Sequence, residues 1–213
     1  MGTAGPATAQ ALQFADAYPP EDLVLQTARR LADEVGLPCV TPGAGAALRL
    51  LAAAGNARSL VEIGTGTGVS GVWLLRGMRP DGVLTTIDVE NEHQRIARRI
   101  FMEAGFAPSR TRIITGRALD VLPRLTDHGY DLVFVDADPT EYAACVAAAG
   151  RLLRTGGVLA VNNALAGGRI GDPAARDPET VLIREVVKDL RDSDDWVPAL
   201  LPTGAGLLTA VRR

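Results

Sequence analysis

The residues best suited to chemistry lie in the stretch VEIGTGTGVS, residues 61–70. An apolar run at 59–63 suits a central strand, and three glycines at alternate positions allow a sharp turn that brings the backbone close to a ligand. A helix after the turn would direct its free N–H groups to the same place. Twenty-four positions after Gly64, the next apolar run ends in Asp88, a carboxylate suited to accept ribose hydroxyls. The pattern predicts a small-molecule cofactor site at two neighbouring strand ends.

The glycines also match the G-x-G-x-x-G pattern of dinucleotide-binding turns at residues 66–71. The register argues against this, because the first glycine after the strand is Gly64, and the third pattern position counted from there is Val69. Glu62 separates the two interpretations, since a carboxylate here can reach the ammonium of a methionine moiety, whereas a dinucleotide fold favours an apolar side chain. The alternative for Glu62 is a cap on a nearby helix or a pair with an arginine. A nicotinamide-dependent oxidoreductase therefore stays a second interpretation.

Length and composition favour one α/β domain. The chain has 213 residues, in which apolar strand-like runs alternate with amphipathic stretches of helix length, as in a parallel sheet. Its 22 basic and 25 acidic side chains give a net charge of −3, without a basic run that would bind nucleic acid. Two cysteines, no secretion signal and no apolar stretch of ~18 residues indicate a cytoplasmic protein without a membrane partner.

The order of expected elements supports this fold class. Residues 1–20 are expected to form a mobile N-terminal segment and residues 21–213 a single domain. Helices are expected at 22–35 and 43–54, with Leu23 and Leu50 among the side chains that face the core. Strands are expected at 59–63, 83–88, 111–115, 132–136 and 158–162, and helices at 69–79, 92–104, 118–125, 141–153 and 179–190. Segments 196–201 and 206–211 flank the turn at 202–205 and predict an antiparallel hairpin at one edge.

Further motifs complete a specific combination: TTID ending at Asp88, GRALDVLPRL from Gly116, YDLVFVDAD from Tyr130, and RLLRTGGVLAVNNALAGGRIGDPAARDPET from Arg151. Together with VEIGTGTGVS, they resemble the S-adenosylmethionine-dependent O-methyltransferases of the catechol and caffeoyl-coenzyme A type, especially small bacterial members. The resemblance covers roughly residues 20 to 213. It implies a Rossmann-like, seven-stranded class I methyltransferase sheet with a reversed last strand, bound S-adenosylmethionine and a homodimer.

The resemblance also implies individual roles in cofactor binding. Glu62 would hold the methionine amino group, and Asp88 would bind the ribose. The other implied positions are Val40, Thr41, Gly64, Thr65, Gly66 and Ser70 around the methionine, Val89, Gly116, Arg117 and Ala118 around the adenine, and Asp136 where cofactor, metal and acceptor meet. Two alternatives stay open, because Arg117 could be a solvated surface side chain and Val40 an ordinary core residue.

The chain departs from the family at the metal site. Members with a divalent cation usually present an aspartate at the fourth strand and an Asp-Asn pair at the end of the fifth, where this chain has Asp136, Asn162 and Asn163. Magnesium favours carboxylate oxygens, so the loss of one should weaken the site without abolishing oxygen ligation. Asp138 could add charge nearby, although a cap or turn role after the strand is the alternative. We therefore expect a weaker metal dependence than in the family's usual members.

The catalytic lysine of the family is also missing, because Pro139 stands three positions after the fourth-strand aspartate. Methyl transfer from an activated sulfonium mainly needs alignment, but a weakly acidic hydroxyl still needs a base or a cation. Asp136 is the predicted catalytic residue and Asp138 a second candidate. Tyr142 either touches the acceptor or cofactor, or packs in the core.

We therefore expect an S-adenosylmethionine-dependent O-methyltransferase (EC 2.1.1.-) that methylates a hydroxyl of a small acceptor, with a phenolic one as the narrower hypothesis. The loop at 164–180 and the region near Phe14 and Tyr18 would shape the acceptor pocket. Pro139 and Asn162 keep open the alternative of a cofactor-binding protein with lapsed or regulatory activity. No motif in the sequence identifies the acceptor.

Overall fold

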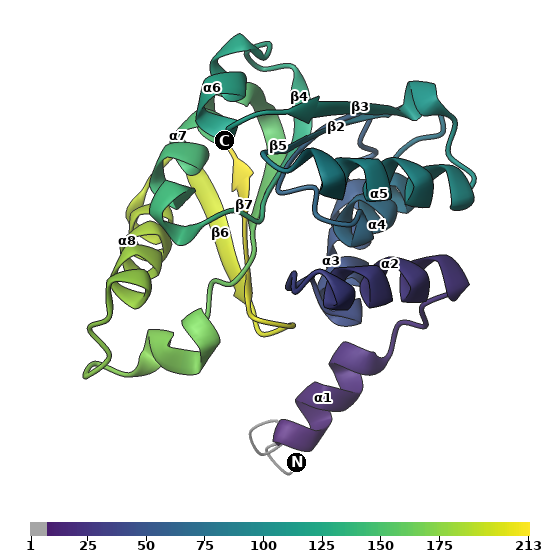
Figure 1. The fold of residues 1–213 in the computed structure, drawn as a ribbon. Helices are drawn as coiled ribbons and strands as arrows, with labels where there is room; N and C mark the ends of the chain where they lie inside the picture. Colours follow the sequence, from purple (N-terminus) through teal and green to yellow (C-terminus); the bar gives the residue numbers. More distant parts are fainter. Residues whose placement is uncertain (1–7) are drawn as a thin grey trace, which may run out of the picture.

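A seven-stranded sheet forms the centre of the computed structural model, which describes residues 8–213 (Figure 1). The strands lie in the order β3-β2-β1-β4-β5-β7-β6; β1 to β5 are parallel, and β7 runs antiparallel to both β5 and β6. Their bounds are β1 Ser59–Ile63, β2 Val83–Asp88, β3 Thr111–Thr115, β4 Tyr130–Val135, β5 Leu153–Val161, β6 Trp196–Leu201 and β7 Leu207–Arg212. The predicted sheet with its reversed last strand is confirmed.

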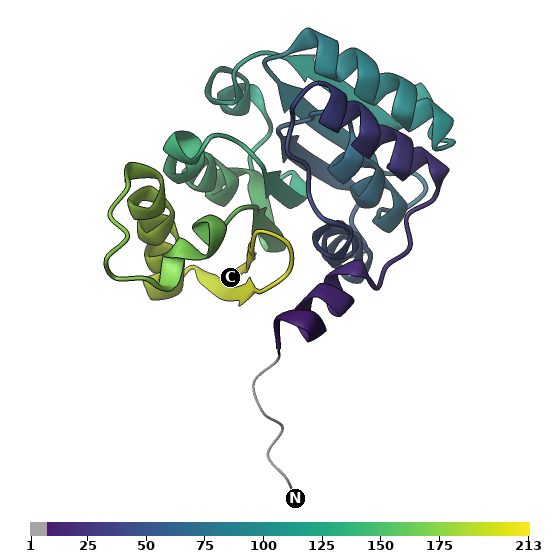
Figure 2. The same cartoon turned by 60° about the horizontal axis from the view of Figure 1, so that its bottom comes forward.

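Helices cover both faces of the sheet (Figures 1 and 2). One face packs against α2 Leu23–Glu34, α3 Pro42–Ala54, α4 Val69–Gly77 and α5 Asn91–Glu103, and the other against α6 Ala118–Val121, α7 Tyr142–Leu152 and α8 Pro178–Asp192. Successive side chains of β1 enter the two cores alternately: Leu60 belongs to one and Val61 to the other. Burial on both faces explains the nearly continuous apolar runs of β1 and β4.

Several boundaries differ from the predicted ones. β4 begins at Tyr130 and β5 at Leu153, earlier than predicted. They end at Val135 and Val161, so Asp136 and Asn162 follow their strands instead of ending them. The helix predicted at 118–125 is α6 followed by a 3₁₀ turn, η2 Leu122–Arg124, because Pro123 has no N–H to continue an α-helix. The other 3₁₀ turns are η1 Pro108–Arg110, η3 Pro139–Glu141 and η4 Ala166–Gly171.

The predicted buried sides of α2 and α3 were partly wrong. Leu23 and Leu50 are 79% and 68% exposed. The buried positions of α2 are Leu25, Ala28 and Ala32, so small side chains let this helix lie close to its neighbours. The prediction from periodicity was wrong at these positions because both helices carry large apolar residues on their outer sides.

Within residues 8–20 the chain forms the helix α1 Ala9–Ala17, where a mobile segment over residues 1–20 was expected (Figure 2). The Thr8 side chain caps it by accepting a hydrogen bond from the Ala11 amide at 3.2 Å. None of its side chains is buried. Residues 1–7 lie outside the described part of the chain, and the mobility and the domain boundary stay predictions. Within residues 8–213, no helix has both the length and the apolarity needed to span a membrane.

Candidate active site

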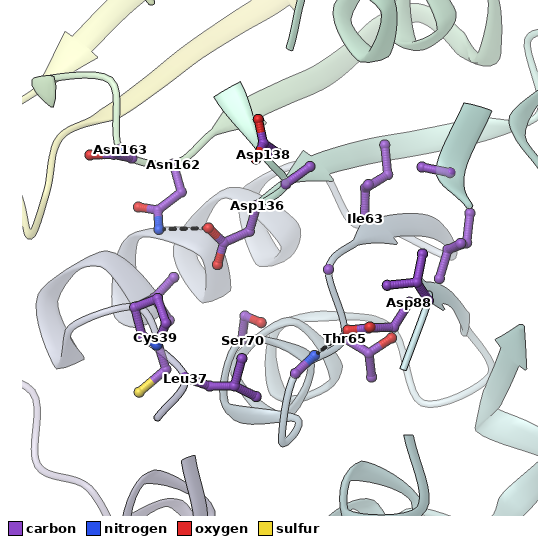
Figure 3. A pocket seen from close by; sticks show the side chains of 18 of the residues that line it. Leu37, Cys39, Ile63, Thr65, Ser70, Asp88, Asp136, Asp138, Asn162 and Asn163 are labelled. Carbon is purple, nitrogen blue, oxygen red and sulfur yellow. Dashed lines mark hydrogen bonds between the residues drawn. The ribbon is translucent and has the colours of Figure 1, made fainter. Parts of the chain in front are cut away.

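A cavity of about 750 Å³ opens where β1, β2, β4 and β5 end (Figure 3). The chain order reverses between the neighbours β1 and β4, and such switch points are where open α/β sheets bind ligands. Most of the predicted site residues line this cavity, namely Val40, Gly64, Thr65, Gly66, Ser70, Asp88, Val89, Gly116, Arg117, Ala118, Asp136, Asn162 and Asn163. Glu62 and Thr41 do not lie on its wall.

Two glycines of the turn have different roles: Gly64 allows close packing, and Gly66 leaves space for a ligand. Gly64 has φ +95°, and a Cβ there would collide with the backbone oxygen of Asp136, so only glycine fits between the ends of β1 and β4. Gly66 has φ +50°, but a Cβ there would meet no atom within 4 Å. Gly66 therefore presents bare backbone to open space, as expected where a ligand approaches closely.

Asp88 is fixed to this turn. Its Oδ2 accepts the Gly66 amide and its Oδ1 the Glu90 amide, each at 2.9 Å. A carboxylate has about four acceptor positions, so both oxygens keep capacity for further donors. The ring of His93 lies near this carboxylate, with Nδ1 3.9 Å from Asp88 Oδ1.

Glu62 lies behind the cavity wall and is fully buried. Its two oxygens accept hydrogen bonds from the hydroxyls of Ser70 and Thr86, each at 2.6 Å, and Thr86 also bonds to Thr65 at 2.7 Å. Burial raises the pKa of the Glu62 carboxyl to about 7, against the lowering effect of these hydrogen bonds. Glu62 thus neither caps a helix nor pairs with an arginine; in this structure it holds Ser70, which does line the cavity.

Asp136 lies across the cavity from Asp88 and beside Asn162 (Figure 3). Its Oδ1 accepts a hydrogen bond from Asn162 Nδ2 at 2.9 Å. Removal from water raises the pKa of Asp136 to about 6, and the Asn162 bond lowers it only in part. Tyr142 is buried and donates its hydroxyl to the Asn162 backbone oxygen at 3.0 Å. Asp138 is exposed and caps η3 by accepting from the Thr140 amide, which is the cap role considered for it.

The residues present do not fit a firmly held divalent cation. Of the three predicted ligands, Asp136, Asn162 and Asn163, only Asp136 has a carboxylate. The side-chain nitrogen of Asn162 donates a hydrogen bond to Asp136, and that of Asn163 donates one to Glu179 Oε1 at 3.1 Å. Between residues 8 and 213, no three or more His, Cys, Asp or Glu side chains are grouped so that they could hold a metal ion. Hard cations are usually bound through carboxylate oxygens, which are scarce here.

Several wall residues were not found from the sequence. Leu37, Pro38 and Cys39 precede α3, Ala205 comes from the β6–β7 turn, and Glu141 precedes α7. None of them belongs to a motif with a chemical spacing. Arg117 lines the cavity, as predicted, but its side chain is largely exposed, as in the surface alternative. Its Nη2 lies 3.3 Å from Glu141 Oε1.

Comparisons with known proteins agree with this geometry. A family model described as O-methyltransferase matches residues 17–213. A Mycobacterium tuberculosis protein described as a "probable O-methyltransferase" is 54% identical over 192 residues, which cover 90% of this chain and 86% of the relative. The chain therefore belongs to the O-methyltransferase family.

Solved structures give the same result. A Corynebacterium glutamicum protein has a TM-score of 0.88 at 37% identity and covers 95% of this chain and 96% of its own. The O-methyltransferase TomG of Streptomyces achromogenes, solved with S-adenosylmethionine, has a TM-score of 0.84 at 32% identity, with 97% and 96% covered. A Bacillus cereus O-methyltransferase solved with S-adenosylhomocysteine has the same TM-score at 28% identity, with 97% and 98% covered. The protein is a class I, S-adenosylmethionine-dependent O-methyltransferase (EC 2.1.1.-), and the nicotinamide alternative was wrong.

Proposed function

We propose that this enzyme transfers the methyl group to a hydroxyl of a small phenolic acceptor, with Asp136 as the base and without a firmly bound cation. The observation that carries the proposal is the Asp136–Asn162 pair on the cavity wall. Asn162 occupies Oδ1, while Oδ2 has no hydrogen-bond partner among residues 8–213 and is free to receive a proton. The carboxylate is thus fixed on one side and available on the other.

The cofactor end of the cavity suits S-adenosylmethionine, which supplies a methyl group already activated on a sulfonium. Gly64 and Gly66 present backbone, and Asp88 keeps acceptor capacity for ribose hydroxyls. Ser70, held by Glu62, lies at the methionine end, where the buried Glu62 carboxylate would favour the ammonium. Gly116, Arg117 and Ala118 would enclose the adenine. The open space above Gly66 is the part of this cradle that any side chain would fill.

The pKa of the proposed base indicates how acidic the acceptor hydroxyl has to be. Proton transfer is efficient when the pKa values of donor and acceptor are not far apart. A phenol, with a pKa of about 10 as in tyrosine, is within reach of a carboxylate whose pKa is raised to about 6. Pro139, at the position of the family lysine, cannot accept a proton, so this position supplies no second base beside Asp136. These relations support a phenolic acceptor.

The proposal is tested with two probe acceptors, catechol and guaiacol, which differ in having two or one free hydroxyl. Methyl transfer to both should persist in EDTA, and calorimetric titration with S-adenosylmethionine should give the same affinity with and without magnesium. Transfer that occurs only with catechol and only with added magnesium would show that a cation activates the acceptor. Cofactor binding without transfer to either probe would favour the lapsed-activity alternative.

We further propose a homodimer in the cytoplasm. Leu23 and Leu50, exposed on α2 and α3, supply apolar surface that a partner copy would cover. Cys39 and Cys145 are both free thiols, as is usual in a reducing compartment. Light scattering at micromolar protein should give the mass of two chains, and a monomer mass would remove the dimer from the proposal.

A further inference from the structure

Asp16, near the end of α1, joins three segments of the chain through one carboxylate oxygen. Its Oδ1 accepts hydrogen bonds from Thr41 Oγ1 at 2.8 Å, Thr203 Oγ1 at 2.9 Å and the Gly204 amide at 2.9 Å. Thr41 precedes α3, whereas Thr203 and Gly204 form the turn between β6 and β7. The contact therefore connects α1 with two parts of the molecule that are far apart in sequence.

Both connected segments continue into the cavity wall. Leu37, Pro38, Cys39 and Val40, directly before Thr41, line the cavity, and so does Ala205, directly after Gly204. The Ala205 backbone oxygen accepts a hydrogen bond from the Leu165 amide, two residues after Asn163, and the charge of Asp136 raises the pKa of the Cys39 thiol, so these parts of the wall lie towards Asp136. Asp16 thus connects two segments that line the cavity near the proposed base.

The junction is closely fitted. A Cβ on Gly43 would collide with the Asp16 carboxylate, and a Cβ on Gly204, which has φ +56°, would lie 2.7 Å from Thr41 Oγ1. The carboxylate also faces the N-terminus of α3, a helix of 13 residues, where a negative charge is favoured. By contrast, α1 buries no side chain of its own. The three hydrogen bonds of Asp16 therefore connect a helix that has no buried side chain to the rest of the chain.

We propose that Asp16 is a positioning residue that, from α1, holds segment 37–41 against turn 202–205 and thereby fixes this part of the cavity wall. The inference rests on the proposed function in so far as the acceptor enters at this end. Loss of Asp16 should loosen this wall and weaken acceptor binding. Cofactor affinity should change much less, because only Val40 and Thr41 of the implied cofactor residues belong to this segment, whereas Gly64, Gly66 and Asp88 lie at the ends of β1 and β2.

Cys39 provides a readout that does not require an acceptor. It lies on the wall that Asp16 holds, whereas the second cysteine of the chain, Cys145, is fully buried. The Cys39 thiol accepts a hydrogen bond from Arg29 Nη1 at 3.0 Å, and burial raises the pKa of the Cys39 thiol. Its reaction with 5,5′-dithiobis(2-nitrobenzoate) should therefore be slow in the intact wall.

Three variants of the full chain test the proposal. Asp16→Ala should accelerate Cys39 labelling at least tenfold and raise KM for guaiacol at least fivefold, with kcat and the Kd of S-adenosylhomocysteine within twofold. Asp16→Asn keeps an Oδ1 acceptor and should restore both values to within threefold of wild type. Gln13→Ala, on the exposed surface of the same helix, should behave as wild type.

Each contrary result has a definite meaning. Wild-type labelling in Asp16→Ala would overturn the proposal, because the wall would then not depend on Asp16. A parallel loss of S-adenosylhomocysteine affinity would overturn it as well, since α1 would then support the whole fold. If neither catechol nor guaiacol is methylated by wild type, the proposed function fails, but labelling and cofactor titration still decide the role of Asp16.

Discussion

The two ends of the cavity are built differently. At the cofactor end, Gly64 and Gly66 follow β1, Asp88 is the last residue of the paired strand β2, and Asp88 bonds directly to the glycine turn. At the acceptor end, the wall combines the segment before α3, the ends of β4 and β5 and the β6–β7 turn, with α1 fastened to it by Asp16. The cofactor end is thus a local construction, whereas the acceptor end is assembled from distant segments.

This difference separates what is shared in the family from what varies. S-adenosylmethionine is the same in every member, and a strand-end construction reproduces one geometry. Acceptors differ, and a wall made of loops changes without disturbing the sheet. The carboxylate that resemblance assigns to a cation site is an amide in this chain, so even the chemistry of this end departs from the usual pattern.

The largest expected effect comes from Asp136→Asn, which removes the proposed base from the acceptor end. Methyl transfer should fall by roughly 10²–10⁴, the usual contribution of a positioned base. The Kd of S-adenosylhomocysteine should change less than threefold, because Asp88 and the glycine turn are untouched. Initial rates with guaiacol and calorimetry measure the two quantities. Asp138→Asn is the matched control, and an equal loss of rate in that variant would remove Asp136 from its proposed role.

Glu62 predicts a pH dependence of stability at the cofactor end, in addition to the one that the raised pKa of Asp136 contributes at the acceptor end. The pKa of Glu62 rises from 4.5 to about 7 in the folded protein, so stability is fully present below pH 4.5 and is lost as pH rises through about 7. The loss should approach about 3 kcal/mol, at 1.36 kcal/mol per unit. Urea unfolding at pH 5 and pH 8 should show a larger loss in wild type than in Glu62→Gln, which keeps only the contribution of Asp136.

The same group links pH to cofactor affinity. If the ligand's ammonium favours ionised Glu62, S-adenosylhomocysteine affinity should increase between pH 6 and pH 8 in wild type and stay flat in Glu62→Gln. Identical pH profiles in the two proteins would show that Glu62 only holds Ser70 and Thr86 in place.

Asp88→Ala removes a carboxylate from the cofactor end and should be the counterpart of Asp136→Asn. The lost charge-assisted hydrogen bonds should cost about 1.5–3 kcal/mol, roughly a tenfold to hundredfold loss of S-adenosylhomocysteine affinity. The rate at saturating cofactor should change little. Asp81→Ala, which removes an exposed aspartate paired with Arg79, is the control. Unchanged calorimetric affinity in Asp88→Ala would exclude Asp88 from cofactor binding.

The smallest effect is expected for Asn162→Asp, which restores a carboxylate at the acceptor end. Magnesium affinity, measured by titration with S-adenosylhomocysteine bound, should rise roughly tenfold, because magnesium is held mainly by carboxylates. Cofactor affinity should stay within twofold. Asn163→Asp, whose side chain faces Glu179, should gain less. If wild type binds magnesium as tightly as Asn162→Asp, the conclusion that this site lacks the ligands for a firmly held cation is wrong.

Much of the fold could be predicted from the sequence alone. β1, β2 and β3 have the predicted bounds, and the turn at Gly64 and the carboxylate of Asp88 lie where the pattern placed them. Strand periodicity, glycine turns and strand-end carboxylates depend on neighbours in sequence, so each is visible in a short stretch of chain. The resemblance added the strand order and the reversed β7.

The direction of individual side chains was decided only in the tertiary structure. The sequence did not indicate that Glu62 turns behind Ser70, that Leu23 faces solvent, or that Ala205 reaches the cavity. Nor did it indicate that Asp16 in the N-terminal region receives donors from Thr41 and the β6–β7 turn. Such contacts join segments remote in sequence, and their geometry depends on how whole helices and strands pack. Local residue patterns determined the sheet and its cofactor turn, and only long-range packing determined the shape of the acceptor end.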